Sequence, residues 1–396
     1  MRYEIMKLNY KHTIYAGYLG YITQAIVNNL APLLFLIFQA SFSLSLQKVT
    51  VLITVNFCVQ LLVDLFSAKF VDYVGYRICI VSAHVLCGAG LIGMAFLPFL
   101  FGDAYGGLLV AVILYAVGGG LIEVLISPIV ESCPTKNKAA AMSLLHSFYC
   151  WGTVAVVLLS TGFLAFFGKE YWRTLSVLWA LLPLGNAVLF SRVPIASLTA
   201  ESEGMSLKEL CTQKMFWIFL VLMVTAGASE QGMSQWASAF AEQGLGVSKA
   251  IGDLAGPCFF SILMGSARTF YAKFGEKIDL LTFMLGSGAL CVFAYLLAAL
   301  SPIPILSLIG CGLCGLSVGI LWPGVFSVAS GHFPRGGTAL FALLALGGDL
   351  GCSSGPTLVG MVAGAYGEDL KAGLIAAVLF PTVLILCIIL CRRNRS

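Results

Sequence analysis

Twelve long apolar runs constrain this chain more than any other feature of its sequence. They lie near residues 13–37, 48–70, 77–99, 106–131, 138–167 and 173–191, and then near 214–240, 250–272, 279–299, 303–331, 336–364 and 371–391. A helix of about 20 apolar residues crosses the hydrocarbon core of a bilayer. Only 10% of the residues are charged, whereas soluble proteins carry about 25%. The sequence therefore predicts an all-α membrane protein with twelve transmembrane helices.

The positively charged residues predict how these helices are oriented. If the N-terminus is cytoplasmic, 17 of the 22 Lys and Arg residues fall on cytoplasmic segments and five on the other side. Such an excess of Lys and Arg sets the topology of a membrane protein. The first apolar run is too long for a signal-peptide core and has no small-residue cleavage site. We expect a retained first span and a multi-pass protein of the inner or plasma membrane, with both termini cytoplasmic.

One polar connection divides the spans into two sets of six. It occupies residues 192–213, so that the predicted bundles are 1–191 and 214–396. The stretches 68–77, AKFVDYVGYR, and 268–277, RTFYAKFGEK, follow the second and eighth spans at an offset of 200 residues. Parallel repeats of this kind are typical of duplicated secondary transporters.

Residues 118–152 are the most informative stretch of the chain, GGGLIEVLISPIVESCPTKNKAAAMSLLHSFYCWG. They predict two membrane helices joined by a polar turn, with Glu123 on the first and His146 on the second. Ionisable side chains are costly in hydrocarbon, so their default interpretation is functional. The alternative is that Glu123 and His146 only satisfy each other as a buried polar contact.

A polar solute that crosses between two helical halves needs hydrogen-bonding and aromatic groups at the depth of the bilayer centre. The N-terminal half offers Gln24, Asn28, Asn29, Glu123, His146, Tyr149 and Trp151 as candidate substrate-binding residues. The C-terminal half offers Glu230, Gln231, Gln235, Trp236, Trp322 and Asp349. For each Trp a place in the core or in an interfacial belt is the alternative, and for Asp349 a place in close helix packing.

Glu123 is the predicted carrier of a coupling proton. Burial favours the neutral form of a carboxyl group, so Glu123 can be protonated when the site is occupied and ionised when it opens to water. His146 is the second predicted proton-coupling residue, because an imidazole titrates near neutral pH.

The connection after the second span is the predicted gate, with Asp72, Gly75 and Arg77 in the first copy and Arg268 in the second. The N-terminus of the eleventh span, near Gly336, carries partial positive charge. We expect Asp72 to dock there and Arg77 to pair nearby, closing the cytoplasmic side. A solvated loop without a gating role is the alternative.

These residues resemble those of the major facilitator superfamily. The first copy is similar to the superfamily's G-x-L-A-D-R-x-G-R-R loop, with Asp72, Gly75 and Arg77 matching and Ala68 in place of the first Gly. The resemblance implies the major facilitator fold, two six-helix bundles that work by alternating access.

Within the superfamily, the chain resembles the fucose permease-like sugar:proton symporters. The matching positions are Glu123, Ser127-Pro128, His146-Ser-Phe148 and Gly152, and residues 28–32, NNLAP, resemble that group's N-N-L-N-D. Pro32 replaces the acid of that motif, and His146 replaces a Gln. The resemblance implies proton-coupled uptake of a small neutral polar solute such as a sugar.

Other classes of function find little support in the sequence. There is no phosphate loop of the Walker type, and the Cys311–Cys314 pair lacks the further ligands that zinc needs. The net charge of +4 fits membrane orientation rather than nucleic-acid binding. We predict a monomer that is not an enzyme and needs no cofactor or metal, and whose partners are a solute, protons and the bilayer. A proton-coupled efflux antiporter and a non-transporting receptor or scaffold are the alternatives.

Overall fold

The computed structural model describes residues 8–134, 138–195, 205, 207–274, 278–333 and 335–393, and every regular element within them is a helix. The N-terminal half contains α1 (Tyr10–Phe42), α2 (Leu46–Val74), α3 (Tyr76–Leu100), α4 (Ala104–Glu131), α5 (Lys138–Phe167), η1 (Lys169–Tyr171) and α6 (Trp172–Arg192). After α7 (Leu207–Thr212), the C-terminal half contains α8 (Lys214–Ser234), α9 (Ala237–Ala239), η2 (Phe240–Gly244), α10 (Lys249–Asp253), η3 (Leu254–Cys258), α11 (Phe259–Phe274), α12 (Leu280–Leu300), α13 (Pro304–Val318), α14 (Leu321–His332), α15 (Gly337–Ala365), α16 (Leu370–Ala377) and α17 (Leu379–Arg393).

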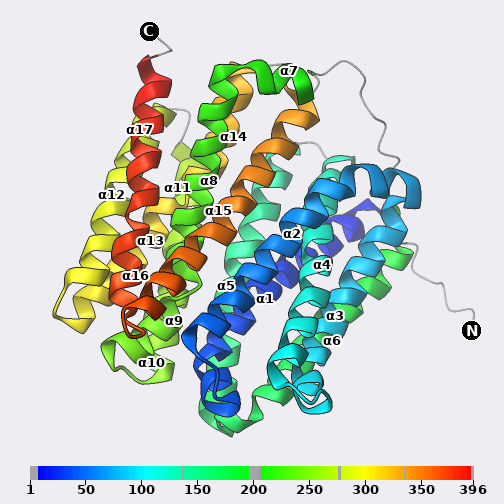
Figure 1. Ribbon diagram of the computed structural model, residues 1–396. Helices are drawn as coiled ribbons and strands as arrows, with labels where there is room; N and C mark the ends of the chain where they lie inside the picture. Colours follow the sequence, from blue (N-terminus) through cyan, green and yellow to red (C-terminus); the bar gives the residue numbers. More distant parts are fainter. Residues whose placement is uncertain are drawn as a thin grey trace, which may run out of the picture.

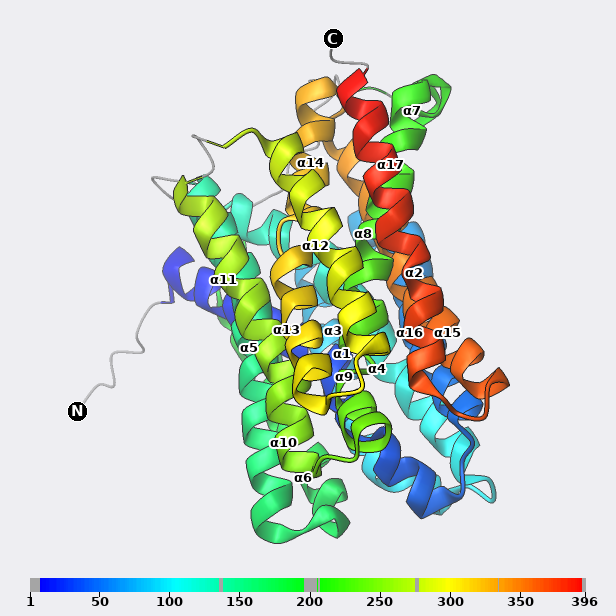
Figure 2. The same ribbon diagram turned by 90° about the vertical axis from the view of Figure 1, so that its left-hand side faces the viewer.

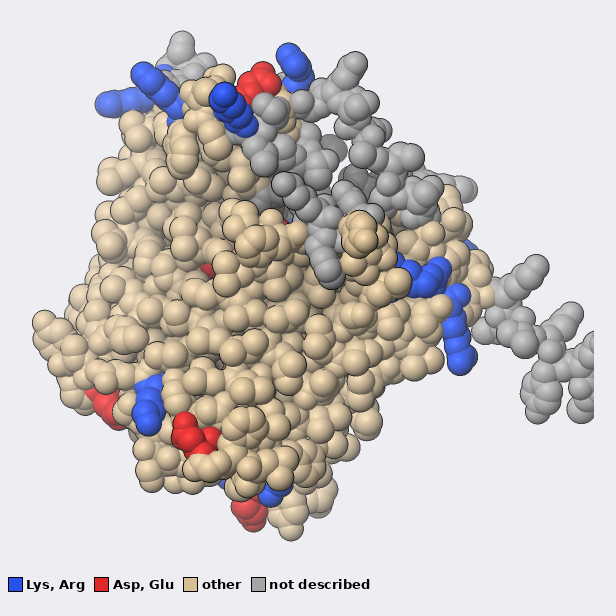
Figure 3. Space-filling model, turned by 45° about the vertical axis from the view of Figure 1, so that its right-hand side comes forward, with Lys and Arg blue, Asp and Glu red and all other residues tan. Residues whose placement is uncertain are grey.

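The helices confirm the predicted all-α membrane architecture. Within the described residues, eleven helical segments are long and apolar enough to cross a bilayer. The twelfth, α15, is 29 residues long. Figure 3 shows charged side chains at the upper, right-hand and lower margins of the molecule, with a broad belt of other residues between them. Such a belt is the surface that a bilayer core requires.

Four spans of the C-terminal half are interrupted, a feature that the apolar runs do not predict. The span that begins with α8 changes to α9 and η2 without a proline, and the other three interruptions lie near one. Helix α10 ends at Asp253, α13 at Val318 and α16 at Ala377. Proline has no N–H to donate to the carbonyl four residues earlier. Pro257 and Pro381 stand four residues after the ends of α10 and α16, and Pro323 stands five residues after the end of α13, which places each of these interruptions. The carbonyl of Gly319, released in this way, accepts a hydrogen bond from Arg268 Nε over 3.2 Å.

The two halves lie side by side, with α1–α6 on the right of Figure 1 and α8–α17 on the left. They meet where α2 runs beside α15 and where α5 runs beside α11, as Figures 1 and 2 show. The upper end in Figure 1 holds α7 and the C-terminus, and we call it the linker end. The other end, with the α1–α2 turn and the α15–α16 connection, is the opposite end. In the predicted orientation the linker end is cytoplasmic.

Small residues bring α15 close to α8 inside the C-terminal half. A Cβ atom added at Gly351 would lie 2.0 Å from the backbone oxygen of Val224, and one at Gly355 would lie 2.4 Å from that of Ala228. Small residues allow helix backbones to approach closely in membranes, where packing replaces the hydrophobic drive. The position of α15, which carries Asp349, is therefore set by tight packing against α8.

Candidate functional site

A network of amide side chains lies where α1 and α2 meet at the centre of the molecule. Gln24 Nε2 donates to Gln60 Oε1 over 2.9 Å, and Gln60 Nε2 donates to Asn28 Oδ1 over 3.0 Å. Asn56 Nδ2 donates to the same Asn28 oxygen over 3.3 Å. All four side chains are buried. Because buried amides need partners, the network holds α1 and α2 in one register.

The network continues into the C-terminal half through α8. Gln235 Nε2 donates to the backbone oxygen of Asn28 over 3.0 Å and to Gln231 Oε1 over 3.0 Å. Gln231 Nε2 lies 3.4 Å from Glu230 Oε1. Gln231 and Gln235 therefore share one face at the C-terminal end of α8, as their four-residue spacing predicts, and Glu230 lies next to Gln231. This face looks across the interface between the halves.

Glu123 borders this network on α4. Its Oε2 accepts a hydrogen bond from Gln24 Nε2 over 3.1 Å, and the residue is half-buried. His146 is exposed, and its ring contacts Tyr21 at a centroid distance of 5.0 Å. Among the described residues no hydrogen bond joins Glu123 to His146. The two side chains thus reach the same region without forming the direct contact that was the structural alternative.

Arg268 lies in a different place from the one that its motif suggests. It lies within α11, where its Nη2 is 3.5 Å from Glu230 Oε2 and its Nη1 donates to Cys150 Sγ of α5 over 3.3 Å. Its guanidinium therefore joins an acid of its own half to the facing helix of the other half. We correct the assignment of Arg268 to a loop gate: the structure puts it in the central cluster.

The central cluster carries an excess of acids. Asp64 of α2, Glu123 of α4, Glu230 of α8 and Asp349 of α15 supply four carboxyl groups, and Asp349 is buried. Arg268 supplies the one guanidinium that the described residues bring to it. Charges in a low-dielectric interior need partners or protons. The cluster therefore favours bound protons or a cation.

Some of the other predicted binding residues lie near the central cluster, and others lie away from it. Asn29 donates to Thr153 Oγ1 of α5 over 3.2 Å, and Tyr149 is half-buried beside Asn28 and Asn29. Trp322 is half-buried against Gly348, one residue before Asp349. Asn29 and Tyr149 therefore lie beside the amide network, and Trp322 lies beside the stretch of α15 that carries Asp349.

Trp236 and Trp151 lie elsewhere. Trp236 is fully buried, donates to the backbone oxygen of Pro356 over 2.9 Å and packs against Phe35. Trp151 is 49% exposed, on the same side of α5 as Leu144 and Leu158, which are seven residues away on either side. We therefore correct both placements: Trp236 packs the interface and Trp151 faces the bilayer.

The predicted gate after α2 is partly described. Gly75 joins α2 to α3 with a φ of 95°, which favours glycine. Arg77 Nη1 donates to the backbone oxygens of Phe190 and Ser191, at the end of α6. The side chain of Asp72 lies outside the described residues. In this conformation Arg77 therefore binds within its own half, and the docking of Asp72 stays a prediction.

The two halves are joined firmly at the opposite end. Asp253 accepts a hydrogen bond from Thr161 of α5 over 2.8 Å, and Lys249 Nζ donates to the backbone oxygen of Leu33 over 2.6 Å. Lys169 and Glu242 form an ion pair of 2.7 Å. Each of these contacts crosses between the halves. The opposite end is therefore closed, while Glu123, Tyr149, Arg268 and Trp322 keep partial exposure at the centre.

Sequence reasoning missed three of the central side chains. Asn56, Gln60 and Asp64 follow one another at intervals of four residues on α2, a spacing that puts polar side chains on one helix face. The spacing was the available signal, but the apolar average of the run concealed it.

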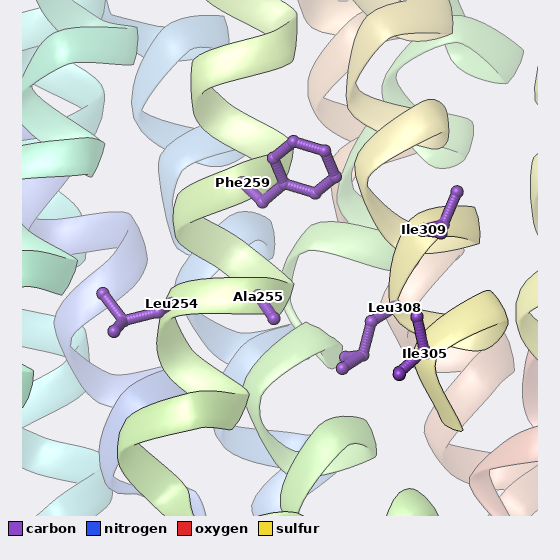
Figure 4. A pocket seen from close by; sticks show the side chains of 6 residues that line it. All are labelled: Leu254, Ala255, Phe259, Ile305, Leu308 and Ile309. Carbon is purple, nitrogen blue, oxygen red and sulfur yellow. The ribbon is translucent and has the colours of Figure 1, made fainter. Parts of the chain in front are cut away.

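A separate cavity of about 470 Å³ lies between η3–α11 and α13. Figure 4 shows that its six labelled side chains come from two neighbouring helical segments. They are Leu254, Ala255, Phe259, Ile305, Leu308 and Ile309. All six are hydrocarbon side chains, and several are exposed on the outer surface. The cavity therefore has the character of a bilayer-facing groove and offers no polar group to a solute.

Comparison with known proteins identifies the family. The family model of the Major Facilitator Superfamily matches residues 17–356. Among curated proteins, none matches the sequence. A bacterial homologue of the human lysosomal transporter Spinster, in an inward-facing and unoccupied conformation, is similar in structure with a TM-score of 0.78, 15% identity and 97% of each chain covered.

Two sugar transporters have the same fold. A D-xylose-proton symporter is similar with a TM-score of 0.75 and 15% identity, covering 96% of each chain. The fucose:proton symporter of E. coli is similar with a TM-score of 0.67 and 15% identity, covering 96% of this chain and 99% of that one. At these identities the structures show the common fold, and together with the family match they lead to one conclusion: the chain belongs to the major facilitator superfamily of transporters.

Proposed function

We propose that this transporter takes up a small neutral polar solute, such as a sugar, together with protons. The observation that carries the proposal is Glu123, a half-buried acid within the membrane-spanning helix α4 that accepts a hydrogen bond from Gln24 over 3.1 Å. A carboxyl group in such a place binds a proton when it loses water and releases it when water returns. Proton binding at Glu123 can thus follow the opening and closing of the site.

The groups around Glu123 suit a hydroxyl-rich solute. Amide side chains offer donors and acceptors together, and Gln24, Asn28, Gln231 and Gln235 supply them from both halves. Tyr149, beside Asn28 and Asn29, and Trp322, beside Gly348, add partly exposed aromatic faces. A neutral solute with several hydroxyl groups can replace the hydrogen bonds that these amide side chains make with one another.

Alternating access gives these groups a transport cycle. The bundles 1–191 and 214–396 would rock about the central cluster as two bodies. The contacts of Asp253, Lys249 and Glu242 close the opposite end, and the partial exposure of Glu123 supports a site open toward the linker end. With both termini in the cytoplasm, this conformation is inward-facing, and the opposite end would open to admit solute and proton.

The excess of acids favours one second candidate. Four carboxyl groups and one guanidinium could also bind a cationic solute in exchange for protons, as in an efflux antiporter. The amide network favours a neutral solute, because the carboxyl groups alone would be enough to bind a cation.

Uptake into proteoliposomes tests the proposal. Labelled hexoses, pentoses and deoxyhexoses, beginning with fucose and xylose, are presented with and without an inward proton gradient. We expect one sugar to accumulate only with the gradient. If no sugar enters under any gradient, and an organic cation instead moves against a proton gradient, the sugar assignment is wrong and the antiporter is correct.

A further inference from the structure

Helices α2 and α15 run antiparallel across the interface in a constant register. Thr54 Oγ1 and Thr357 Oγ1 are 2.5 Å apart, and Cys58 Sγ lies 3.2 Å from Ser353 Oγ. Four residues forward on α2 correspond to four residues backward on α15. The same register places Asp64, about two turns after Cys58, beside the stretch that carries Asp349.

The carboxyl groups of Asp64 and Asp349 face each other at that point. They lie within hydrogen-bonding reach of one another, one from each half of the molecule. Asp349 is 4% exposed. Asp64 Oδ1 and Asp349 Oδ2 are buried and receive no hydrogen bond from any described residue. Two ionised carboxylates cannot donate to each other, so the pair as it stands lacks a donor.

Among the described residues, the surroundings supply more negative charge to the pair and no counter-charge. Gly120 brings α4 against Val63 of α2, with an added Cβ only 2.9 Å from the valine side chain, and Glu123 lies one turn further along α4. The thiol of Cys352 and the ring of Trp322 cover the α15 side. Arg268 is engaged by Glu230. Two unpartnered charges side by side in such a site would be very costly.

A proton satisfies this pair better than a metal ion does. Hard cations such as Ca²⁺ take about six to eight oxygen ligands, whereas the two carboxyl groups offer four oxygens. No group of three His, Cys, Asp or Glu side chains within the described residues is arranged to hold a metal. One proton makes one carboxyl a donor to the other and reduces the charge of the pair to a single negative.

We propose that Asp64 and Asp349 share one proton across the interface between the halves, and so form a second proton site beside Glu123. In the occupied site the O–H of one carboxyl donates to an oxygen of the other; on release the proton passes to water and both groups ionise. Sharing requires α2 and α15 to stay together at this depth. Proton loss therefore weakens the contact between the halves, and separation of the helices favours proton loss.

The proton site itself can be tested without a known solute; only its role in coupling rests on the proposed function. Infrared difference spectra of the lipid-reconstituted full chain, in H₂O and D₂O across a pH titration, detect the carbonyl stretch of protonated carboxyl groups. The variants are Asp64→Asn, Asp349→Asn, the double variant, Glu123→Gln and the control Asp103→Asn. Asp103 is exposed, and its carboxylate caps the N-terminus of α4 by accepting hydrogen bonds from backbone N–H groups. An Asn side chain can cap a helix in the same way.

We expect one carbonyl component that Asp64→Asn and Asp349→Asn each shift or remove, that the double variant removes, and that Glu123→Gln and Asp103→Asn leave in place. The inference is overturned if the double variant retains every component, or if the two single variants remove two separate ones. A component that responds to Na⁺ at constant pH would overturn it as well, because it would indicate a cation site. Loss of a different component in Glu123→Gln would support the proposed function whether or not Asp64 and Asp349 share a proton. The shared proton site and the proposed function can therefore fail independently. If the double variant does not fold, the single variants decide.

Discussion

Replacement of Thr161 by Val should shift the protein away from the conformation that is closed at the opposite end. Asp253 is 1% exposed and accepts hydrogen bonds from Thr161 of the N-terminal half and from Ser238 of its own half. Lys249 lies 3.1 Å from the same carboxylate. When the opposite end opens, the contact with Thr161 must break, whereas the contacts with Ser238 and Lys249 can persist. Of the hydrogen bonds and ion pairs that Asp253 makes, only the one with Thr161 therefore distinguishes the two conformations.

The size of the shift follows from the type of bond. A hydrogen bond to a charged group contributes about 1.5–3 kcal/mol. Each 1.4 kcal/mol changes an equilibrium about tenfold, so Thr161→Val should raise the ratio of open to closed opposite ends roughly 10- to 150-fold. Ser238→Ala removes a hydroxyl from the same carboxylate within one half. It should lower stability in both conformations and leave the ratio nearly unchanged.

Double electron–electron resonance between two spin labels measures the ratio of open to closed opposite ends. Glu170 and Gln243 are exposed on either side of the interface, next to the Lys169–Glu242 ion pair, and can be labelled as cysteines. The exposed native Cys58 and Cys211 are replaced by serine. Thr161→Val should populate the longer distance and Ser238→Ala should not. Equal effects of the two variants, or no effect of Thr161→Val, would refute the reasoning.

Three further predictions concern stability and gating. Glu230→Gln leaves the guanidinium of Arg268 without a carboxylate and should lower the free energy of unfolding by about 3 kcal/mol; a double variant with Arg268→Gln should recover part of this in thermal unfolding, and no recovery would count against the ion pair. Gly351→Ala forces a Cβ against a backbone oxygen of α8 and should cost about 1–3 kcal/mol, whereas Gly286→Ala, with nothing within 4 Å, should be nearly neutral; equal melting temperatures would contradict the packing argument. Asp72→Asn should increase the inward-facing population, and unchanged cysteine accessibility from the cytoplasmic side would disprove its role as a latch.

The fold could be predicted from the sequence because a membrane-crossing helix is defined by its length and its apolar composition. Both can be summed over a segment without knowledge of its neighbours. The interruptions after α10, α13 and α16 could not be predicted from the sequence, although a proline follows each. Pro32, Pro98, Pro128, Pro183 and Pro356 lie within continuous helices. Whether a proline breaks a helix depends on how the released carbonyl is satisfied, as Gly319 is by Arg268, and that is decided by tertiary packing.

The candidate site was readable only in part, for a related reason. Intramembrane acids and amides such as Glu123 and Gln231 stand out because few functions other than a polar site justify them. Arg268 was assigned to a loop because a motif placed it there, although α11 continues to Phe274. Trp151 was grouped with the site although its side of α5 faces outward. Which face of a helix turns inward depends on its neighbours, and an aromatic residue in an apolar run gives no sign of that.

The most direct test of the account compares Glu123→Gln with the parent protein in two modes of transport. In proteoliposomes, accumulation driven by an inward proton gradient requires the proton carrier, whereas exchange of labelled for unlabelled solute at equal pH requires only binding and rocking. The account predicts that Glu123→Gln loses gradient-driven accumulation and retains exchange. Accumulation that persists in Glu123→Gln would contradict it, since the coupling proton would then not be carried by Glu123.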